Sequence, residues 1–256
     1  GLGYRLMPEL NLYAGWSKGF ETPTLAELAY SGTGGRFGFD LQPARSEQFE
    51  LGLRAALAQD GRLQAALFHI HTDDELVVAS ALGGRTVYQN AARTRRRGLE
   101  LGLEQPLGER WRTRLSYTWL DARYSEAFAT AQGQVVERGN RLPGVSRHAL
   151  FADLAWQLLA GMEFGIEASV RSDVEVNDLN SDRAAPGHAL FASYARFEQR
   201  WGGLVVRETL RIDNLADREH VGSVIIGEGT RRYYEPGAGR SWYVGLSLEY
   251  PLGGGD

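Results

Sequence analysis

Apolar and polar residues alternate along most of this chain, a pattern typical of β-strands that bury only one face. In residues 111–119 the odd positions read Trp, Thr, Leu, Tyr and Trp, and the even positions read Arg, Arg, Ser and Thr. The last such segment carries Trp242 and Tyr250 at the two ends of its apolar side. The alternation predicts a partial strand at 1–7 and ten full strands at 11–20, 44–58, 62–78, 86–104, 111–124, 144–157, 162–176, 187–200, 204–216 and 238–250.

The connections between these strands alternate between short and long. Short turns are expected at 8–9, 59–61, 106–109, 158–161 and 201–203, and long loops at 21–43, 79–85, 125–143, 177–186 and 217–237. A barrel that crosses a membrane has tight turns on one side and long external loops on the other. A soluble sandwich with Greek-key crossings has no reason to sort its loops by length. The prediction is therefore an all-β fold, a transmembrane antiparallel up-and-down β-barrel meander, with a soluble β-sandwich as the alternative.

Composition narrows the functional classes without changing this fold. The net charge of −4 gives no reason to expect a nucleic-acid surface, and the absence of cysteine excludes disulfides and thiolate metal sites. No apolar run reaches the roughly 18 residues of a transmembrane helix, and the mean hydropathy of −0.32 suits strands whose two faces cancel. The first ten residues indicate a strand end and a turn rather than a signal peptide, so we expect the chain to begin within a larger fold.

Two places break the alternation. Arg93, Arg95 and Arg97 share the apolar side of their strand, where an arginine near mid-bilayer would cost roughly 2–4 kcal/mol. Either a bulge near Gly98 shifts the register and turns them inward, or they lie above the hydrocarbon layer. Glu208 also lies on the apolar side of its strand, and the pattern offers no account of it.

Five segments resemble those of the TonB-dependent outer-membrane receptors. They are SKGFETPTLAEL at 17–28, NAARTRRRGLELGL at 90–103, NRLPGVSRHALFADLAW at 140–156, RIDNLADREHVGS at 211–223 and GLSLEY at 245–250. The last segment matches that family's assembly signal at Gly245, Leu248 and Tyr250, although PLGGGD follows where the family usually ends. The resemblance is specific because all five segments occur in the family's order over most of the chain.

The resemblance implies a plugged barrel of about 22 strands. Residues 1–256 would form its C-terminal portion, of about 10–11 strands, and the plug domain would lie outside this chain. It also implies a bacterial outer-membrane location, contact with outer-membrane lipid and lipopolysaccharide, and neither enzymatic activity nor a cofactor. The implied function is energy-coupled uptake of a scarce metal chelate, driven by TonB and its inner-membrane energising complex through the plug. A ferric siderophore is the favoured ligand, while cobalamin, haem and copper complexes remain open.

A complete small outer-membrane barrel is the alternative within membranes. Such a barrel would act as a passive channel or as an enzyme of the outer-membrane protease type. It would have to pair residues 1–7 or 11–20 with residues 238–250, whereas half of a larger barrel leaves both edges open to further strands.

Arginines and aromatic residues of the external loops and upper wall are the candidate ligand-binding residues. Together they suit an anionic, partly aromatic ligand, through charge-assisted hydrogen bonds and stacking. The candidates are Tyr30, Arg36, Phe37, Tyr124, Arg141, Arg231, Arg232, Tyr233 and Tyr234. The competing interpretation is charge pairing within the lumen together with interfacial aromatics.

Two polar clusters raise the question of other chemistry. HIHTDDE at 69–75 places His69 and His71 on one strand face, as a metal site or an acid–base pair would require. DVEVNDLNSD at 173–182 is acidic, but it lacks the glycine and glutamate that define a calcium loop. We interpret the first as a solvated strand end and the second as a polar external loop, with metal binding and catalysis as the alternatives.

Overall fold

The computed structural model describes residues 1–31, 38–130 and 132–250, and it confirms the all-β meander. Eleven strands form one antiparallel sheet in the order β1-β2-β3-β4-β5-β6-β9-β10-β11-β12-β15. The strands are β1 (Leu2–Met7), β2 (Leu10–Glu21), β3 (Ala44–Ala56), β4 (Arg62–Leu82), β5 (Arg85–Leu107), β6 (Trp111–Tyr124), β9 (His148–Leu159), β10 (Met162–Arg171), β11 (His188–Trp201), β12 (Leu204–Asp213) and β15 (Ser241–Glu249).

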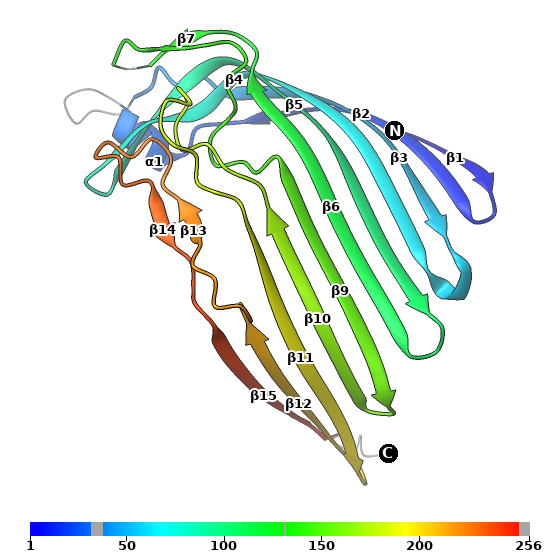
Figure 1. The fold of residues 1–256 in the computed structure, drawn as a ribbon. Coiled ribbons are helices and arrows are strands. Elements are labelled where there is room, and N and C mark those ends of the chain that lie inside the picture. The colour runs from blue at the N-terminus through cyan, green and yellow to red at the C-terminus, as the bar shows by residue number, and fades with distance from the viewer. Residues whose placement is uncertain (32–37, 131, 251–256) are drawn as a thin grey trace, which may run out of the picture.

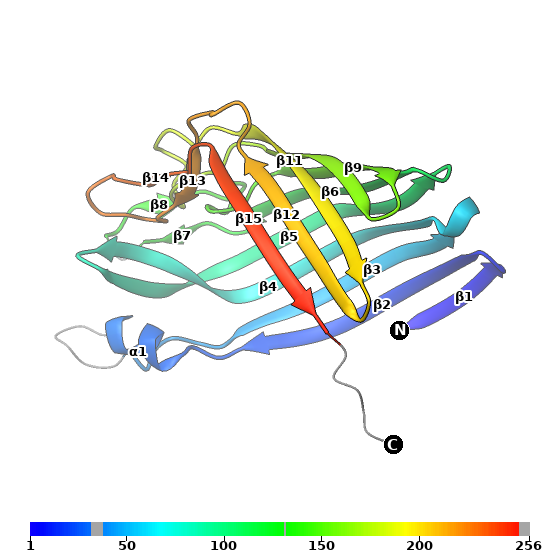
Figure 2. The same cartoon turned by 90° about the horizontal axis from the view of Figure 1, so that it is seen from below.

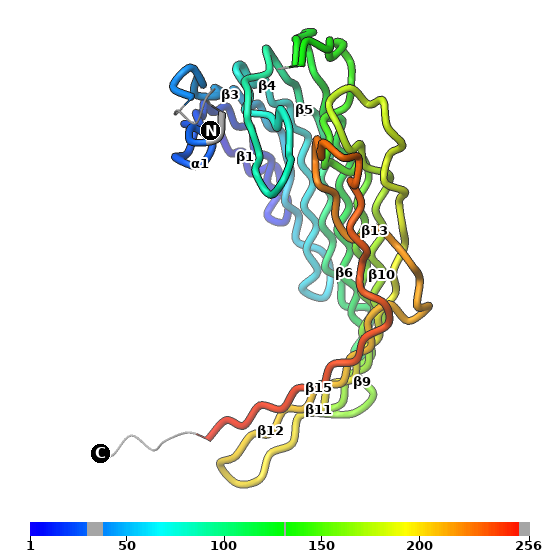
Figure 3. The backbone as a smooth tube through the Cα atoms, turned by 90° about the vertical axis from the view of Figure 1, so that its left-hand side faces the viewer, coloured from blue at the N-terminus to red at the C-terminus, as the bar shows by residue number. Residues whose placement is uncertain are grey.

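The sheet curves into an open half-cylinder (Figure 1). Figures 2 and 3 show β1 and β15 as its two free edges. Within the described residues, β1 pairs with β2 alone and β15 with β12 alone. A complete small barrel requires these edges to meet, so the pairing favours part of a larger barrel.

Short and long connections lie at opposite ends of the sheet, as the chain pattern predicts (Figure 1). The short end holds tight turns and the 3₁₀ turn Ala58–Asp60. The long loops contain α1 (Leu25–Ser31) and the two-stranded ribbons β7 (Phe128–Ala129)–β8 (Val135–Val136) and β13 (Val221–Val224)–β14 (Tyr234–Pro236). No helix in the described part of the chain is long and apolar enough to cross a membrane.

The long loop predicted at 79–85 is wrong. β4 and β5 run for 21 and 23 residues and keep pairing as far as Leu82 and Arg85. Gly83 and Gly84 close this hairpin with φ of 60° and 76°. Glycine adopts that left-handed backbone without a steric penalty, which makes a two-residue turn possible. The hairpin therefore extends the sheet well beyond the level of its neighbours (Figure 1).

One face of the sheet is apolar across its whole width. Residues that are register partners on neighbouring strands share a face, so a single row can be followed from strand to strand. One such row consists of Leu12, Leu53, Ala65, Leu101, Tyr117, Leu150, Val170 and Ala189. This face carries most of the large exposed hydrophobic side chains, including Leu51, Leu67 and Ile166.

The opposite face is polar, and its ion pairs identify it as the concave one. Arg211 on β12 lies 2.7 Å from Glu167 on β10, and Arg112 on β6 lies 2.9 Å from Glu163 on β10. Each pair spans an intervening strand, which side chains can do when a curved sheet makes them converge. The apolar face is therefore the convex, outward one, as in a membrane barrel.

Tryptophans mark the two ends of the apolar band. Trp111 and Trp119 lie on the outward face of β6, and Trp111 stacks on Trp156 with ring centroids 5.6 Å apart. Eight residues of a strand tilted by about 40° rise roughly 20 Å, close to the 25 Å apolar band of outer-membrane barrels. Aromatic rows at these two levels are typical of membrane interfaces.

The register through Gly98 contains no bulge, so the first explanation of the three arginines is wrong. β4 and β5 pair without a shift from Arg62 to Asp73. Arg93, Arg95 and Arg97 consequently point outward, beyond the level of Trp119 and toward the loops. Their position agrees with the second explanation, that they lie above the hydrocarbon layer.

Glu208 is paired with an amide rather than left alone on the outward face. Its carboxylate accepts a hydrogen bond from Gln199 Nε2 over 3.3 Å. Both residues lie close to the tight turn between Trp201 and Leu204, at the short-loop end. A polar pair at that level costs much less than one at the centre of a membrane.

Gly165 accommodates an aromatic ring on the concave wall, and we expect a larger residue there to destabilise the sheet. A Cβ at position 165 would lie 2.2 Å from Cζ of Tyr194, whose hydroxyl donates to the buried Asp153 over 2.9 Å. Gly165→Val should displace the ring and lower the free energy of unfolding by about 3 kcal/mol. Urea titration of the intact protein in detergent would measure this.

The matched control is Gly15→Val, because a Cβ at position 15 meets nothing within 4 Å. Its free energy of unfolding should change by less than about 0.5 kcal/mol. Equal destabilisation by the two substitutions would contradict the role assigned to the Tyr194 ring.

Candidate ligand-binding site among the external loops

Three long loops at the same end of the sheet pack on one another. They are L1 (125–147, between β6 and β9), L2 (172–187, between β10 and β11) and L3 (214–240, between β12 and β15). Gly144 N of L1 donates to Glu175 O of L2 over 2.9 Å, and Gly227 N of L3 donates to Val176 O of L2 over 3.0 Å. Ala81 N, near the tip of the β4–β5 hairpin, donates to Gly227 O over 3.0 Å. The three loops and the hairpin therefore form one connected layer.

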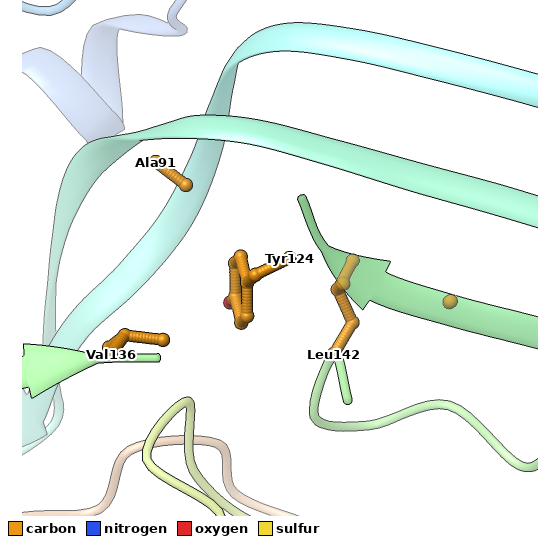
Figure 4. Close-up of a cluster of buried hydrophobic side chains, with 5 residues drawn as sticks. Ala91, Tyr124, Val136 and Leu142 are labelled. Atoms are coloured by element: carbon orange, nitrogen blue, oxygen red, sulfur yellow. The ribbon is translucent and has the colours of Figure 1, made fainter. Parts of the chain in front are cut away.

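A hydrophobic cluster holds L1 against the inner wall of the sheet. Its buried members are Ala91, Ala122, Tyr124, Val136 and Leu142. Figure 4 shows the Tyr124 ring at the centre, with Ala91, Val136 and Leu142 around it. Because β5, the end of β6 and L1 all contribute side chains, L1 is anchored by burial as well as by backbone hydrogen bonds.

Tyr124 also links this cluster to L2. Its hydroxyl donates to Asp178 Oδ1 over 2.7 Å, and both side chains are buried. Burial raises the pKa of the Asp178 carboxyl to about 6, while the hydrogen bond from Tyr124 acts in the opposite direction. The loop layer thus contains an acid that changes charge near neutral pH.

A cavity of about 500 Å³ opens between the loops and the β4–β5 hairpin. Its wall includes Thr130, Gln132 and Gln134 of L1, Asn177, Asp178, Ser181 and Asp182 of L2, and Glu228, Arg231 and Tyr233 of L3. Ser80 and Leu82 of β4 close another side. The polar side chains of the lining are mainly amides, hydroxyls and carboxylates, while Val78, Ala79 and Leu179 add apolar surface. The polar groups suit a ligand rich in carbonyl or hydroxyl groups.

The carboxylates around this cavity already have partners in the described structure. Asp182 Oδ2 accepts from Asn177 over 2.6 Å and from the Tyr233 hydroxyl over 2.9 Å, and Arg231 lies 3.3 Å from its other oxygen. Glu228 accepts from the backbone N–H of Arg232, the main reason why the pKa of Glu228 is lowered. The side chains left for a ligand are therefore mainly amides, hydroxyls and the exposed guanidinium of Arg231.

Two of the candidate residues line this cavity, Arg231 and Tyr233. Tyr234 lies next to Tyr233 but is directed to L2, where its hydroxyl donates to the carbonyl of Arg183. Arg232 is fixed through its backbone N–H. The four candidate residues of L3, at 231–234, thus lie at or beside the cavity. Their contact with a ligand stays a prediction.

The other candidates lie elsewhere. Arg141 is paired with Asp173 at 2.6 Å and with Glu175 at 3.3 Å, and the Tyr124 ring is enclosed. Arg36 and Phe37 lie outside the described residues, as does the side chain of Tyr30. If Arg141 or Tyr124 influences ligand binding, it does so by holding the loops in position and not by touching the ligand.

Sequence reasoning missed the amides and hydroxyls of the cavity. Thr130, Gln132 and Gln134 lie in L1 between the strands β7 and β8, and Asn177 and Ser181 lie in L2. The available signal was TAQGQ at 130–134, where two glutamines stand close together in a predicted external loop. The search for arginines and aromatics passed over them.

The two polar clusters are resolved into local contacts. His69 and His71 share the outward face of β4, and His71 Nε2 lies 3.8 Å from Asp73. In L2, Asp173 and Glu175 pair with Arg141, whereas Asp178 contacts Tyr124. No group of three or more potential metal ligands is found within the described ranges.

The acid at position 178 predicts a pH dependence of loop order. Because the folded-state pKa is raised from 3.8 to about 6, the packing of L2 is most stable below about pH 4 and weakens as pH rises through 6. This difference between the folded and the unfolded pKa of Asp178 corresponds to about 3 kcal/mol of loop stability. Hydrogen exchange in the intact protein, corrected for the intrinsic exchange rate at each pH, should show greater protection of the Gly227 and Gly144 amides at pH 5 than at pH 8.

Asp178→Asn supplies the matched control, since asparagine still accepts from Tyr124 but does not ionise. Its loop amides should exchange with the same protection at both pH values, after correction for the intrinsic rate. A pH response equal to that of the wild type would show that another group controls the loops.

The chain is similar to known proteins in sequence and in fold. The family model described as "TonB dependent receptor-like, beta-barrel" matches residues 1–215. The sequence is 23% identical over 216 residues to the probable TonB-dependent siderophore receptor PiuA of Acinetobacter baumannii, covering 82% of this chain and 28% of PiuA. It is 25% identical over 256 residues to the probable TonB-dependent receptor BfrD of Bordetella pertussis, covering 33% of that protein. The chain spans about a third of the length of these relatives.

Solved structures show the same fold at low sequence identity. The siderophore receptor PiuA of A. baumannii superposes with a TM-score of 0.70 at 20% identity, covering 97% of this chain and 34% of PiuA. The unliganded ferric citrate transporter FecA gives a TM-score of 0.73 at 17% identity, covering 94% and 36%. The copper transporter OprC gives 0.72 at 17% identity, covering 95% and 38%.

Proposed function

The chain belongs to the TonB-dependent receptor family, and we propose that it forms about half of the barrel wall of an outer-membrane receptor for metal chelates. The observation that carries this proposal is the open eleven-stranded sheet with an apolar convex face, a polar concave face and one layer of linked external loops. The two free edges would pair with the remaining strands of the barrel. The concave ion pairs would face a plug, through which TonB and its inner-membrane complex would supply energy.

A ferric siderophore is the ligand we propose first. PiuA is named as a siderophore receptor, and structural neighbours are named for ferric citrate, ferric catecholates and copper. In this chain, Arg231 is 73% exposed at the rim of the loop cavity and could pair with an anionic chelate. Amides from L1 and L2 would hydrogen-bond to its carbonyl or hydroxyl groups.

Uptake of ⁵⁵Fe, with ⁶⁴Cu as the label for the copper chelate, tests this proposal. Iron-starved cells would be offered ferric citrate, a ferric catecholate or a copper chelate, with and without the gene for the full-length receptor. Loss of uptake of one iron chelate on deletion, and of the same uptake on removal of TonB, is the expected result. Unchanged uptake of every iron chelate, with loss of copper uptake instead, would overturn the assignment to iron.

Arg231→Gln should weaken binding of the transported ferric chelate about tenfold, the usual effect of one charge-assisted hydrogen bond. Binding would be measured by tryptophan fluorescence quenching in detergent. Arg200→Gln is the matched control, because Arg200 is also largely exposed and pairs with Glu198 at the short-loop end. Equal affinities of the two variants would show that Arg231 does not contact the ligand.

A further inference from the structure

Two rows of mainly polar side chains cross the outward face of the sheet above the apolar band. The row nearest the band contains Phe49, His69, Arg97 and Asp121 as successive register partners. The next contains Lys18, Glu47, His71, Arg95, Arg123 and Arg141. The strands turn from apolar to strongly charged within two residues, at the level where lipid headgroups would begin.

Three arginines surround the carboxylate of Asp121 in the first of these rows. Asp121, whose side chain is 3% exposed, lies 2.7 Å from Arg123, 3.2 Å from Arg97 and 3.4 Å from Arg147. Arg95 lies beside them, as the register partner of His71 on β4 and of Arg123 on β6. The Asp121 carboxylate therefore faces three guanidinium groups, with Arg95 beside them. Arg147 also attracts Asp173, but that carboxylate is already paired with Arg141.

Arg95 and Arg147 lack the partners that buried nitrogens normally have. Nε of each is buried and makes no hydrogen bond in the described structure. Arg95 also forms no ion pair there, although it stands directly opposite Arg123 on the neighbouring strand. Like charges directly opposite on adjacent strands are destabilising, and a bound anion would remove that repulsion.

We propose that Arg95, Arg97, Arg123 and Arg147 bind the phosphate of an anionic lipid in the outer leaflet. Guanidinium groups bind phosphate oxygens through paired, charge-assisted hydrogen bonds. Side chains of Arg97 and Arg147 are 51% and 41% exposed, so the site is open on its outer side.

The position of the site selects a lipid over a soluble anion. Leu99, Leu101 and Leu103 continue directly below Arg97 on the same face of β5, next to Trp119. A lipid whose phosphate sits among the arginines would lay its acyl chains along this apolar strip. A phosphomonoester is favoured over a zwitterionic headgroup, because an ammonium group would be repelled by the excess of guanidinium.

Binding of dioleoyl phosphatidic acid to the purified full-length receptor tests the site. Native mass spectrometry in a non-ionic detergent would compare that lipid with dioleoyl phosphatidylcholine and with inorganic phosphate. Wild type should bind phosphatidic acid at least tenfold more tightly than phosphatidylcholine, and inorganic phosphate should give no adduct at the same concentration. Arg95→Gln should weaken phosphatidic acid binding about tenfold, and the Arg95→Gln/Arg123→Gln double variant should remove the preference.

Arg112→Gln is the control, since Arg112 lies on the concave face and pairs with Glu163. It should bind phosphatidic acid as the wild type does. Equal binding by wild type and Arg95→Gln would overturn the proposal, and an equal adduct with inorganic phosphate would overturn its assignment to lipid.

The inference rests on the proposed outer-membrane placement but not on the chelate carried. In the described structure Arg95 Nε makes no hydrogen bond and the side chain forms no ion pair, so Arg95→Gln should remain a heat-resistant barrel in the outer-membrane fraction. A wild-type receptor absent from that fraction would overturn the proposed function. A correctly placed receptor without lipid preference would overturn only the lipid site.

Discussion

Arginine in place of Leu115 is expected to block assembly of the barrel. Leu115 lies on the outward face of β6, midway between Trp111 and Trp119, with Leu103 and Ala152 as its register partners. At the centre of the apolar band a guanidinium costs roughly 2–4 kcal/mol. The full-length receptor carrying Leu115→Arg should be depleted from the outer membrane and should lose the shift in gel mobility between unheated and boiled samples.

Ser116→Arg is the matched control, one residue along the same strand. Ser116 lies on the concave face beside Gly102 and Phe151, in a wall that already holds Arg112 and Arg114. Its barrel should assemble at the wild-type level. Normal assembly of Leu115→Arg, or equal failure of both variants, would contradict the assignment of faces.

Replacement of Asp121 by asparagine should produce the second large effect. The carboxylate is buried and faces three guanidinium groups, so its loss leaves their charges unbalanced. Breaking a buried ion pair from one side typically costs 3–5 kcal/mol, and the exposure of the arginines favours a value of about 3 kcal/mol here. Urea unfolding of the full-length receptor in a phosphate-free, non-ionic detergent would measure it.

A double variant separates charge from packing. If repulsion among the arginines is the cause, Asp121→Asn/Arg123→Gln should recover part of the stability lost by Asp121→Asn. No recovery would mean that the carboxylate acts through its hydrogen bonds alone. If Asp121→Asn lowers the free energy of unfolding by less than about 0.5 kcal/mol, the carboxylate does not balance the charge of the surrounding arginines as described.

The strands could be predicted from the chain because each has one apolar and one polar face. β6 is the clearest case, and its predicted range 111–124 agrees with Trp111–Tyr124. The alternation with a period of two lies within each strand, so it can be recognised without knowing which strands are its neighbours in the sheet. The order of short and long connections then determined the meander.

The β4–β5 hairpin shows where this reasoning stops. Residues 79–85 look like a loop because Ser80, Gly83 and Gly84 interrupt the alternation. The strands nevertheless continue to pair through Leu82 and Arg85. Above the membrane, backbone hydrogen bonds between the two strands hold the hairpin together, and an alternation of apolar and polar residues is not required. Alternation disappears wherever both faces of a strand meet water or other loops.

The candidate site could be predicted only in part for a related reason. The L3 residues Arg231 and Tyr233 are close in sequence, so a local pattern finds them. The Tyr124–Asp178 hydrogen bond joins residues 54 positions apart. Nothing local indicates which loop covers which, and the buried acid becomes apparent only when the loop layer is assembled.

The central claim is that alternate residues of these strands face lipid, and spin labels test it directly. Single cysteines would be placed in turn at positions 98–103 of β5 in the full-length receptor, a segment that contains no native cysteine. Accessibility to oxygen, which concentrates in lipid, would be compared with accessibility to a water-soluble nickel complex. The account predicts high oxygen accessibility at 99, 101 and 103 and low values at 98, 100 and 102. Equal accessibility at successive positions, or nickel exceeding oxygen at 101, would contradict it.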